Sequence, residues 1–520
     1  MRKKTAIHKT QVLIIGGGAT GAGIARDLSL RGVECILAER RDFNSGASGA
    51  NHGLLHSGAR YVRNDPQAAR ECRDESRLLK KLAPQCIENT GGLFVAVEGD
   101  DENFVADFPH LCTRCTIAVE ELDIDEAREL EPALSDKLIA AFRVDDAAVD
   151  PFRLSLENIA QAVELGCSLQ LYSQVVGFTR RNRRIQAVRL LNTKTGRETT
   201  VEANFVVNAT GAWAAEVAAL AGARIDLLYS KGSLLITDKR ISYRVLNRLR
   251  HSSDADILVP GGTVSILGTT SIRMDCLDDI RPTIGEIDYL IDTAAAMVPT
   301  LKTVRYIRAY AGVRPLLDSK SLDDGRALSR GFAVLDHAAE GLENFASIVG
   351  GKLTTYRKMA EQTSDLVCRR LGIHAACRTR TQPLPARQDC RWTVAGLAPR
   401  LWLEQRQNDD LLLCECEMVP TSAVDVIVDS LRRQKAEPDL YAIGRRSRIG
   451  KGTCQGAFCG IRVTGYMYDR GNLTADQGLK DLRAFLTARW RGMRPMLWGA
   501  AVIQEELQEA LHCGLFGLEL

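Results

Sequence analysis

The 520-residue sequence lacks a long hydrophobic run. A helix that crosses a bilayer needs about 20 predominantly apolar residues, and the longest apolar stretch, residues 205–223, is broken by Asn208 and Glu216. The basic start, Met1–Lys4, precedes only the apolar segment Val12–Ile15, which is too short for a signal peptide and predicts a strand. We therefore expect a cytoplasmic protein that meets a membrane only at its surface.

The sequence also lacks a strong charge bias and a disulfide pattern. Its formal net charge is +3, without a basic stripe interleaved with aromatics, so nucleic-acid binding is not indicated. The 15 cysteines are scattered without the spacing of a secreted scaffold, which favours a reducing compartment. Cys112 and Cys115 form an isolated C-x-x-C that we interpret as ordinary thiols. The chain is too long for a single core, and we expect two or three domains.

The N-terminal segment 11–39 has the pattern of a dinucleotide-binding fold. A buried strand leads into Gly16, Gly18 and Gly21, spaced as G-x-G-x-x-G, and a helix and a second strand follow. Such glycines provide a tight turn, room for backbone beside a pyrophosphate and close helix–strand packing. The unsatisfied N–H groups at the helix start then face the phosphates. Glu39 ends the second strand, where a carboxylate binds ribose hydroxyls.

Two further segments favour FAD over a nicotinamide cofactor. Residues 40–61 are rich in Gly, Ser and Ala, whereas a plain nicotinamide dehydrogenase would enter another helix there. Residues 205–213 predict a hydrophobic strand that ends in an A-T-G turn. FAD enzymes of the glutathione-reductase type have a similar strand beside the cofactor. We therefore expect FAD.

Four segments carry a resemblance to a known family. They read H-S-G-A-R-Y at 56–61, G-T-T at 268–270, A-G-V-R-P-L at 311–316 and G-G-K-L-T-T-Y-R at 350–357. In this order they resemble the FAD-dependent glycerol-3-phosphate dehydrogenases, within the wider D-amino-acid-oxidase-like group. The resemblance implies an α/β, glutathione-reductase/D-amino-acid-oxidase-like, FAD-binding Rossmann-type domain interleaved with an α+β substrate domain, together spanning residues 10–372.

The same resemblance implies oxidation of sn-glycerol 3-phosphate to dihydroxyacetone phosphate, with the hydride passing to FAD. The expected FAD contacts are Gly16, Gly18, Gly21, Glu39, Arg40, Ser48, His52, Val176, Thr210, Gly211, Gly351, Lys352, Leu353 and Thr354. The expected substrate contacts are Arg60, Thr270, Arg314, Arg330 and Lys352. A phosphate dianion favours several fixed cations, and arginine offers bidentate donors for it.

Oxidation of an alcohol requires that the hydroxyl proton leave as the hydride does, and a base must reach that hydroxyl. The expected catalytic residues are His56, Arg60, Arg314 and Lys352. His56 is the candidate base because imidazole titrates near neutrality. Two alternatives stay open: His56 only packs beside the flavin, or cations such as Arg60 lower the pKa of the alcohol enough to make a dedicated base unnecessary.

Late in the chain, four cysteines form two tight pairs. Cys414 and Cys416 make C-x-C, and Cys454 and Cys459 make C-x4-C. Four thiolates of this kind hold iron–sulfur clusters. Zinc also takes four cysteines, but its pairs are usually separated by about two to four residues, so C-x-C is tight for it. We favour a [2Fe–2S] cluster, with zinc and an empty site as alternatives.

Residues 411–466 resemble the mainly helical, bacterioferritin-associated-ferredoxin-like [2Fe–2S] domain, which anaerobic, quinone-linked members of the family carry and the shorter aerobic members lack. This resemblance implies that electrons pass from FAD through the cluster to partner subunits and membrane quinone. It also implies a peripheral position at the inner face of the cell membrane, held through those subunits.

Local patterns inside this module predict further features. Residues 421–433 have helical periodicity, with Thr421 as the expected N-cap. The basic loop 445–452 is expected to compensate an anionic cluster or to dock a partner. Glycines around the second cysteine pair are expected to let backbone N–H groups reach the sulfurs. These glycines are Gly450, Gly452, Gly456 and Gly460.

Two segments flank the module. Residues 373–410 predict a linker that docks against the flavin domain, because their periodicity is weak. The tail, residues 467–520, contains amphipathic stretches at 479–490 and 500–512. These stretches are interpreted either as helices that pack within the protein or as a face for a partner subunit.

Two other functions stay open. An amino-acid or 2-hydroxy-acid dehydrogenase would use the same flavoprotein scaffold, but a carboxylate substrate needs one arginine clamp, whereas a phosphate makes use of several cations. A non-catalytic electron-transfer subunit would relay electrons without a substrate site. The intact set of substrate-side motifs argues against this last function.

Overall fold

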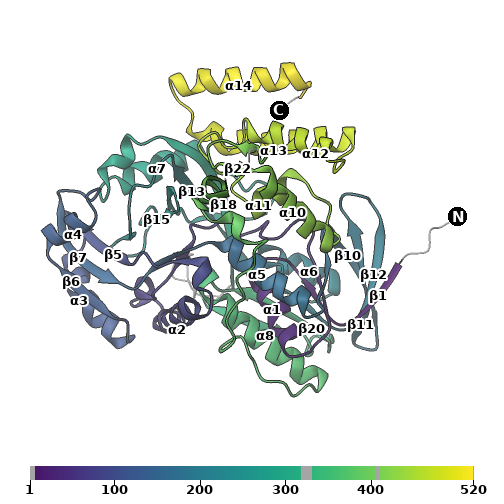
Figure 1. The fold of residues 1–520 in the computed structure, drawn as a ribbon. Coiled ribbons are helices and arrows are strands. Elements are labelled where there is room, and N and C mark those ends of the chain that lie inside the picture. The colour runs from purple at the N-terminus through teal and green to yellow at the C-terminus, as the bar shows by residue number, and fades with distance from the viewer. Residues whose placement is uncertain (1–5, 318–330, 406–408, 519–520) are drawn as a thin grey trace.

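The computed structural model describes residues 6–317, 331–405 and 409–518. Two large sheets form the body of the molecule, and the C-terminal helices lie above them in the view of Figure 1. Arg330, predicted to contact substrate, falls outside the described residues. Within the described ranges, no helix has both the length and the apolar composition needed to cross a bilayer.

The first sheet has the expected Rossmann-type arrangement. Its strands are β1 (Ala6–Ile15), β2 (Cys35–Ala38), β9 (Ser168–Gln170), β10 (Ser173–Arg181), β11 (Arg184–Asn192), β12 (Glu198–Asn208), β19 (Phe332–Asp336) and β20 (Phe345–Gly350). The order β20-β12-β1-β2-β9 is parallel throughout. β19 extends it on β20, and β11 and β10 extend it on β12, all by antiparallel pairing.

Helices cover both faces of this sheet. α1 (Ala19–Leu30), α5 (Pro151–Glu164) and α8 (Tyr356–Leu371) share a core with one face, and α6 (Ala214–Ala221) shares a core with the other. Successive side chains of a strand point to opposite faces. Val12 and Ile14 of β1 therefore pack on the first side, and Leu13 and Ile15 pack on the second. Burial on both faces explains why this strand is a continuous apolar run.

The second domain is built on a mixed sheet of nine strands. They are β5 (Gly92–Val97), β6 (Val119–Leu122), β7 (Leu138–Val144), β13 (Leu227–Thr237), β14 (Val245–Arg248), β15 (Ile257–Gly261), β16 (Val264–Gly268), β17 (Ile272–Met274) and β18 (Tyr306–Leu317). Its helices are α2 (Pro66–Leu82), α3 (Glu102–Arg114), α4 (Ile124–Leu130) and α7 (Ile284–Ala294). A small sheet contains β3 (Leu54–Leu55), β8 (Ala147–Val149) and β4 (Ile87–Glu88). β13 and β18 pair antiparallel along their whole length, and this pair carries part of the site described below.

The C-terminal part is mainly helical. Its elements are α9 (Leu397–Gln405), β21 (Leu412–Cys414), β22 (Val419–Pro420), α10 (Thr421–Arg433), α11 (Leu440–Arg446), α12 (Cys459–Asp469), α13 (Ala475–Met493) and α14 (Ala500–Phe516). α10 has the predicted bounds, but the predicted N-cap is wrong. Thr421 donates its hydroxyl to Asp410, and the Asp410 carboxylate accepts the backbone N–H of Ser422. A carboxylate from outside the helix thus accepts one backbone N–H of its first turn.

The C-terminal module packs onto the first domain and does not stand apart from it. Its apolar residues share one core with α1, α5 and the first sheet. Arg446 of α11 donates to both carboxylate oxygens of Asp42, at 2.5 and 3.0 Å, in the loop that follows β2. The two side chains are only 3% and 0% exposed. The module and the expected FAD-binding domain therefore share a buried ion pair.

Candidate active site and cysteine centre

The glycine loop lies where β1 meets α1. Gly16 has a φ of +110°, and a Cβ there would lie 2.5 Å from the carbonyl oxygen of Ala209. A Cβ at Gly21 would lie 1.9 Å from the carbonyl oxygen of Gly16, and one at Gly18 would approach the Ser48 hydroxyl to 2.9 Å. Only glycine allows the turn and the helix to pack this closely. The loop brings the first N–H groups of α1 within reach of a pyrophosphate, and it fits FAD.

Other predicted cofactor residues gather around this loop. Ser48 Oγ accepts the backbone N–H of the first residue of α1 at 2.9 Å. Glu39 is buried at the end of β2, and its Oε2 accepts the N–H of Gly17 at 2.7 Å. The guanidinium of Arg40 lies 4.0 Å from the centre of the Trp213 ring. The carboxylate and the hydroxyl are thus fixed next to the glycine turn.

Three more predicted cofactor residues lie on or after strands of the first sheet. The register between β10 and β11 shifts between Val175 and Gly177, so Val176 is skipped in the ladder. Thr210 and Gly211 follow β12, and Gly211 also lines the cavity described next.

A cavity of about 250 Å³ is lined by residues of both domains. Its predicted lining residues are Ser48, His52, His56, Arg60, Gly211, Arg314, Gly351, Lys352 and Leu353. Within the described part of the chain, the lining contains no Asp or Glu. Three cations and no carboxylate therefore face this cavity, which suits an anionic ligand.

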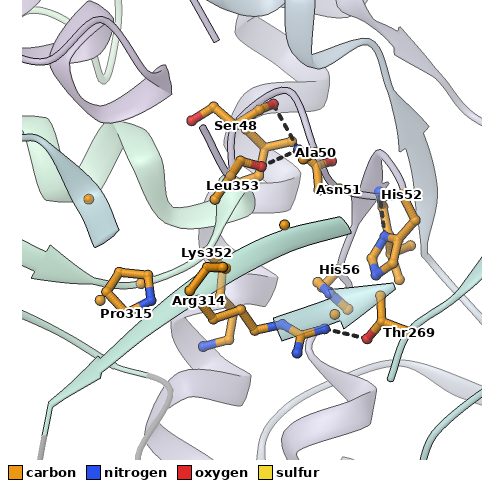
Figure 2. Close-up of a pocket in the computed structure, with 18 of the residues that line it drawn as sticks. Ser48, Ala50, Asn51, His52, His56, Thr269, Arg314, Pro315, Lys352 and Leu353 are labelled. Atoms are coloured by element: carbon orange, nitrogen blue, oxygen red, sulfur yellow. Dashed lines mark hydrogen bonds between the residues drawn. The ribbon is translucent and has the colours of Figure 1, made fainter. Parts of the chain in front are cut away.

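Arg314 is held in place by the strands around it. It lies on β18, opposite Ser230 of β13. Its Nη1 donates to the carbonyl of Thr270 at 3.2 Å and to Ser230 Oγ at 3.4 Å, and its Nη2 donates to the Thr269 hydroxyl. Figure 2 shows the guanidinium directed toward Thr269. Gly232 provides the space, because a Cβ there would lie 2.6 Å from Nη2.

Thr270 lies behind this arginine and does not line the cavity. Its hydroxyl donates to Glu286 at 3.2 Å and accepts the N–H of Ser233 at 2.9 Å. Burial raises the pKa of Glu286, but hydrogen bonds, led by the one from Lys231, lower it by more, so its net pKa lies below the ordinary value. The structure therefore gives Thr270 a supporting place next to Arg314 instead of the predicted substrate contact.

Lys352 and Arg60 are each fixed by a neighbour. The Lys352 Nζ lies 4.5 Å from the centre of the Tyr61 ring, within the range of a cation–π contact. Arg60 donates to Asp256 at 2.9 Å, and Arg250 donates to the other oxygen of the same fully buried carboxylate at 2.9 Å. The buried carboxylate thus sets the position of Arg60 at the cavity wall.

His56, the candidate base, is buried at the cavity. Its Nε2 lies 3.4 Å from the Tyr61 hydroxyl, and its backbone N–H donates to Thr354 Oγ1 at 3.2 Å. Thr354 is buried and does not line the cavity itself, unlike the preceding Gly351, Lys352 and Leu353. The ring of His52 lies 6.1 Å away, edge-on to His56. The imidazole of His56 is therefore oriented by Tyr61 within a cationic cavity.

Several polar lining residues were not predicted from the sequence. They are Asn51, Tyr61, Ser252, Ser253, Thr269 and Ser271. Tyr61 and Thr269 stand inside the motifs 56–61 and 268–270, so those motifs contained the signal. Ser252 and Ser253 lie in a loop without a motif, and only the fold brings them to the cavity.

The four predicted cysteines come together from two separate loops. Cys414 ends β21 and Cys459 begins α12, and both are buried, whereas Cys416 is exposed. The sulfurs of Cys414 and Cys416 lie 3.9 Å apart, and those of Cys416 and Cys454 lie 3.6 Å apart. Cys459 is hydrogen-bonded to Cys414 and Cys454. All four are free thiols, as are the buried Cys112 and Cys115.

Hydrogen bonds favour the thiolate at two of these positions. Bonds from Cys416 and then Cys459 lower the pKa of Cys414 to about 4 and that of Cys454 to about 2. Among the described residues, no group of three or more His, Cys, Asp or Glu is arranged to hold a metal ion. In a [2Fe–2S] cluster each iron takes two of the four cysteines, so paired sulfurs suit its ligand set. The cluster stays a prediction.

Three of the four predicted glycines make room for Phe485 of α13. A Cβ would lie 2.8 Å from its ring at Gly450, 2.5 Å at Gly456 and 3.1 Å at Gly460. Gly456 also donates its backbone N–H to Cys454. The predicted approach of N–H groups to sulfur is present at Gly456, but the packing of a tail helix against these glycines was not predicted.

The basic loop 445–452 is engaged with carboxylates. Arg446 binds the buried Asp42, and Arg448 donates to both oxygens of Glu417 at 2.9 Å. These two arginines are therefore paired with carboxylates, and compensation of the cysteine centre by the basic loop stays a prediction.

Comparisons with known proteins agree with this geometry. Residues 11–357 match the family described as FAD dependent oxidoreductase. The chain is 43% identical to a subunit of the anaerobic glycerol-3-phosphate dehydrogenase of Escherichia coli (strain K12), over 98% of each chain. It is 38% identical to a subunit of the anaerobic glycerol-3-phosphate dehydrogenase of Haloferax volcanii, over 96% of this chain and 89% of that one.

Solved structures show the same fold. The glycerol-3-phosphate dehydrogenase from Bacillus halodurans, complexed with FAD, superposes with a TM-score of 0.63 at 22% identity, over 94% of this chain and 96% of that one. A glycine oxidase from Geobacillus kaustophilus superposes with a TM-score of 0.59 at 21% identity, over 73% of this chain and 99% of that one. At such low identity, these two structures establish the fold alone.

Proposed function

The chain belongs to the FAD-dependent oxidoreductase family, and on this premise we propose that it is the catalytic subunit that oxidises sn-glycerol 3-phosphate to dihydroxyacetone phosphate. The observation that carries the proposal is the cavity beside the glycine loop. It is lined by Arg60, Arg314 and Lys352 and, among the described residues, by no carboxylate. Three cations around one cavity suit a phosphate dianion, whereas a carboxylate substrate needs one arginine. The names of the relatives state the same substrate.

Arg314 and Lys352 are the proposed phosphate ligands. The β13–β18 pair and the Thr270 carbonyl hold Arg314, so its planar donors are oriented before substrate binds. Preorganised donors lose little entropy on binding and therefore add affinity. Lys352 follows the glycines at the end of β20 and reaches the same cavity. We extend the substrate site to Arg60 and, from the family pattern, to Arg330.

His56 is the proposed acceptor of the hydroxyl proton. As the C–H hydrogen leaves with its electron pair, the O–H proton must leave too, so that the alcohol carbon becomes a carbonyl. Bound FAD supplies the two-electron acceptor. His56 Nε2 already holds a hydrogen-bond position against Tyr61, and the cations around it favour the developing alkoxide.

One spectrum tests the substrate. We expect the flavin bands of anaerobically purified protein to bleach with sn-glycerol 3-phosphate and to stay unchanged with the enantiomer, sn-glycerol 1-phosphate. Glycine, proline and lactate serve as probes of the amino-acid and 2-hydroxy-acid alternative. Bleaching by one of these but not by glycerol 3-phosphate would overturn the proposal. Absence of bleaching by every substrate would favour a non-catalytic subunit.

The cysteine centre is the proposed exit for electrons. We assign a [2Fe–2S] cluster to Cys414, Cys416, Cys454 and Cys459, because paired thiolates suit its ligand set and Cys416, one of the four, is exposed to solvent. FAD carries two electrons and such a cluster carries one, so the pair suits stepwise delivery to a protein. Iron and acid-labile sulfide in equal amounts, with negligible zinc, are the expected analysis. Zinc bound by the four cysteines, in place of iron and sulfide, would contradict the proposed electron transfer through this centre.

An apolar stripe on α14 offers a surface for a partner subunit. Ile503, Leu507, Leu511 and Leu515 recur every fourth residue and are 71%, 61%, 47% and 72% exposed. In Figure 1, α14 is the outermost helix of the C-terminal part. A contiguous exposed apolar surface of this kind is typical of an interaction site.

Charge favours a protein over a lipid surface as the occupant of this stripe. After Arg494 the sequence contains no Lys or Arg, and Glu506 is exposed next to Leu507. A helix that lies on an anionic membrane carries Lys and Arg on its polar face. The proposed occupant is therefore an apolar, basic-rimmed surface of a partner subunit. In this proposal, contact with the membrane and with quinone is made through that partner.

A further inference from the structure

Two arginines from distant parts of the chain meet at the loop that follows Cys454. Arg489 of α13 is 3% exposed, and its Nε donates to the carbonyl oxygen of Cys454 at 3.1 Å. Arg308 of β18 donates from Nη1 to Oε1 of Gln455 at 3.2 Å. α13 packs directly on Arg308, because a Cβ at Gly492 would lie 3.1 Å from its Cγ. Two guanidinium groups from distant parts of the chain therefore hold this loop.

The positive charge at this loop exceeds the negative charge of the nearby carboxylates. Arg489 pairs with Glu505 at 2.7 Å, and its Nη1 has no hydrogen-bond partner among the described residues. Burial lowers the pKa of Arg308, whose charged and titratable neighbours are Tyr441, Tyr310 and Arg489. Within the described residues no carboxylate is paired with Arg308. Arg308 is half-buried, and a cation that is partly withdrawn from water without a counter-charge is costly.

An anionic centre at the four cysteines would supply the missing counter-charge. Four thiolates and two bridging sulfides outweigh the charge of two ferric ions, so the centre is anionic, and it becomes more so on reduction. Nearby positive charge therefore stabilises the reduced form. We propose that Arg308 and Arg489 position the loop Cys454–Gln455 and raise the reduction potential of the cysteine centre.

The strand that carries Arg308 also reaches the substrate cavity. Alternate residues of a strand share a face, so Tyr310 and Arg314 of β18 lie on the same face as Arg308. The hydroxyl of Tyr310 donates to the Asn51 carbonyl at 2.8 Å. The arginine that favours electron acceptance and the arginine that binds substrate thus stand on one strand. This inference rests on the proposed cluster.

The test compares three variants of the full-length, anaerobically purified chain. Arg308→Gln removes the charge, Arg308→Lys keeps it, and Arg462→Gln removes a control charge that is 42% exposed and paired with the exposed Glu415. Potentiometric titration followed by electron paramagnetic resonance gives the potential. At a fixed applied potential, we expect Arg308→Gln to lower the ratio of reduced to oxidised centre at least about tenfold. For a one-electron couple this corresponds to a reduction potential lower by about 59 mV. The other two variants should change the ratio less than about twofold, since Arg308→Lys keeps the charge and the exposed charge at Arg462 is screened.

Each outcome is decisive. An unshifted potential in Arg308→Gln with full iron and sulfide overturns the inference and leaves the cluster intact. If Arg308→Gln loses iron, iron retained at the wild-type potential in Arg308→Lys supports the inference, and iron lost from both variants overturns it. If the wild-type chain is purified without iron, both the proposed cluster and this inference are overturned. Flavin bleaching by glycerol 3-phosphate is recorded on the same samples and reports the substrate proposal separately.

Discussion

The buried pair between Asp42 and Arg446 predicts that the flavin domain and the C-terminal module are stabilised together. In Asp42→Asn, the guanidinium of Arg446 would lose an anion that accepts two of its hydrogen bonds at 2.5 and 3.0 Å. Removing one partner of a buried pair costs about 3–5 kcal/mol, because the other charge stays buried. We expect the free energy of unfolding to fall by this amount.

The same substitution should loosen the cofactor. Asp42 accepts the backbone N–H of Phe43 at 2.9 Å, and the Phe43 ring lies 2.9 Å from the position a Cβ would take at Gly17. The glycine loop therefore rests on a residue whose neighbour is fixed by the module. Thermal unfolding followed by circular dichroism, together with the fluorescence of released flavin, should show both transitions shifted downward in parallel.

A double-mutant cycle isolates the pair. Arg446→Gln alone should also destabilise the protein, and the double variant should lose less than the sum of the single changes, because neither charge is then stranded. Asp226→Asn, in an exposed pair with Arg224, serves as the control and should cost less than about 1 kcal/mol. Additive losses, or flavin release that stays at the wild-type temperature while the module unfolds earlier, would refute the reasoning.

The pair also predicts a pH dependence. Burial raises the pKa of Asp42, but Arg446 lowers it by more, so the net pKa lies below the ordinary value. A carboxyl with a depressed folded-state pKa contributes stability that is present above its ordinary pKa of about 3.9 and is lost as the pH falls through the folded-state value. The difference in unfolding free energy between wild type and Asp42→Asn should therefore be the same at pH 7 and pH 5 and should shrink below about pH 4.

Four other tests address separate parts of the proposal. Arg314→Ala should retain FAD but lower kcat/KM for glycerol 3-phosphate at least about tenfold, since losing a charged hydrogen-bond donor costs about 1.5–3 kcal/mol; near-wild-type dye-linked kinetics would contradict the assignment. Gly18→Val should abolish flavin binding, because even a Cβ would meet a hydroxyl at 2.9 Å; a yellow, fully loaded variant would refute this. Joint replacement of Cys454 and Cys459 by Ser should remove iron and sulfide together and stop quinone reduction in the reconstituted complex, with dye-linked activity retained; persisting quinone reduction would exclude the relay. Phe485→Ala should lower the iron content per chain, since the half-buried ring fills the space against Gly450, Gly456 and Gly460, whereas Phe485→Leu should retain most of it; full iron in Phe485→Ala would show that the ring does not support the centre.

Structural features that are determined by residues close together in the sequence were predictable. The G-x-G-x-x-G loop, its strand and its helix follow from local spacing, and the structure places them as expected. α10 has the predicted bounds because its apolar periodicity is strong and Gln434 ends it where the pattern stops. The cations of the cavity were predicted through motifs whose glycines are needed for close packing, as at Gly312 in the motif of Arg314, where a Cβ would lie 2.3 Å from the carbonyl oxygen of Ala50.

Features that depend on contacts between distant segments were not predictable. The cap of α10 comes from Asp410, and the partner of Arg446 is Asp42, some four hundred residues earlier in the chain. Charge patterns in one sequence do not identify which carboxylate an arginine will meet. Thr270 was predicted as a substrate contact because its motif reaches the site, but in the segment between β16 and β17 Thr269 and Ser271 line the cavity, whereas Thr270 is buried against Glu286.

A module fixed to the body has a consequence for electron transfer. If residues 373–410 were a loose tether, the distance between the flavin and the cysteine centre would vary, and transfer would wait for the two to meet. The shared core and the contact of Arg308 with Gln455 hold the module against the strand that carries Arg314. Transfer within the chain should then take place at one distance. In the proposed relay, the remaining variable step is delivery to the partner subunit. If the α14 stripe is the proposed docking surface, changes to it should lower turnover with quinone more strongly than turnover with a soluble dye.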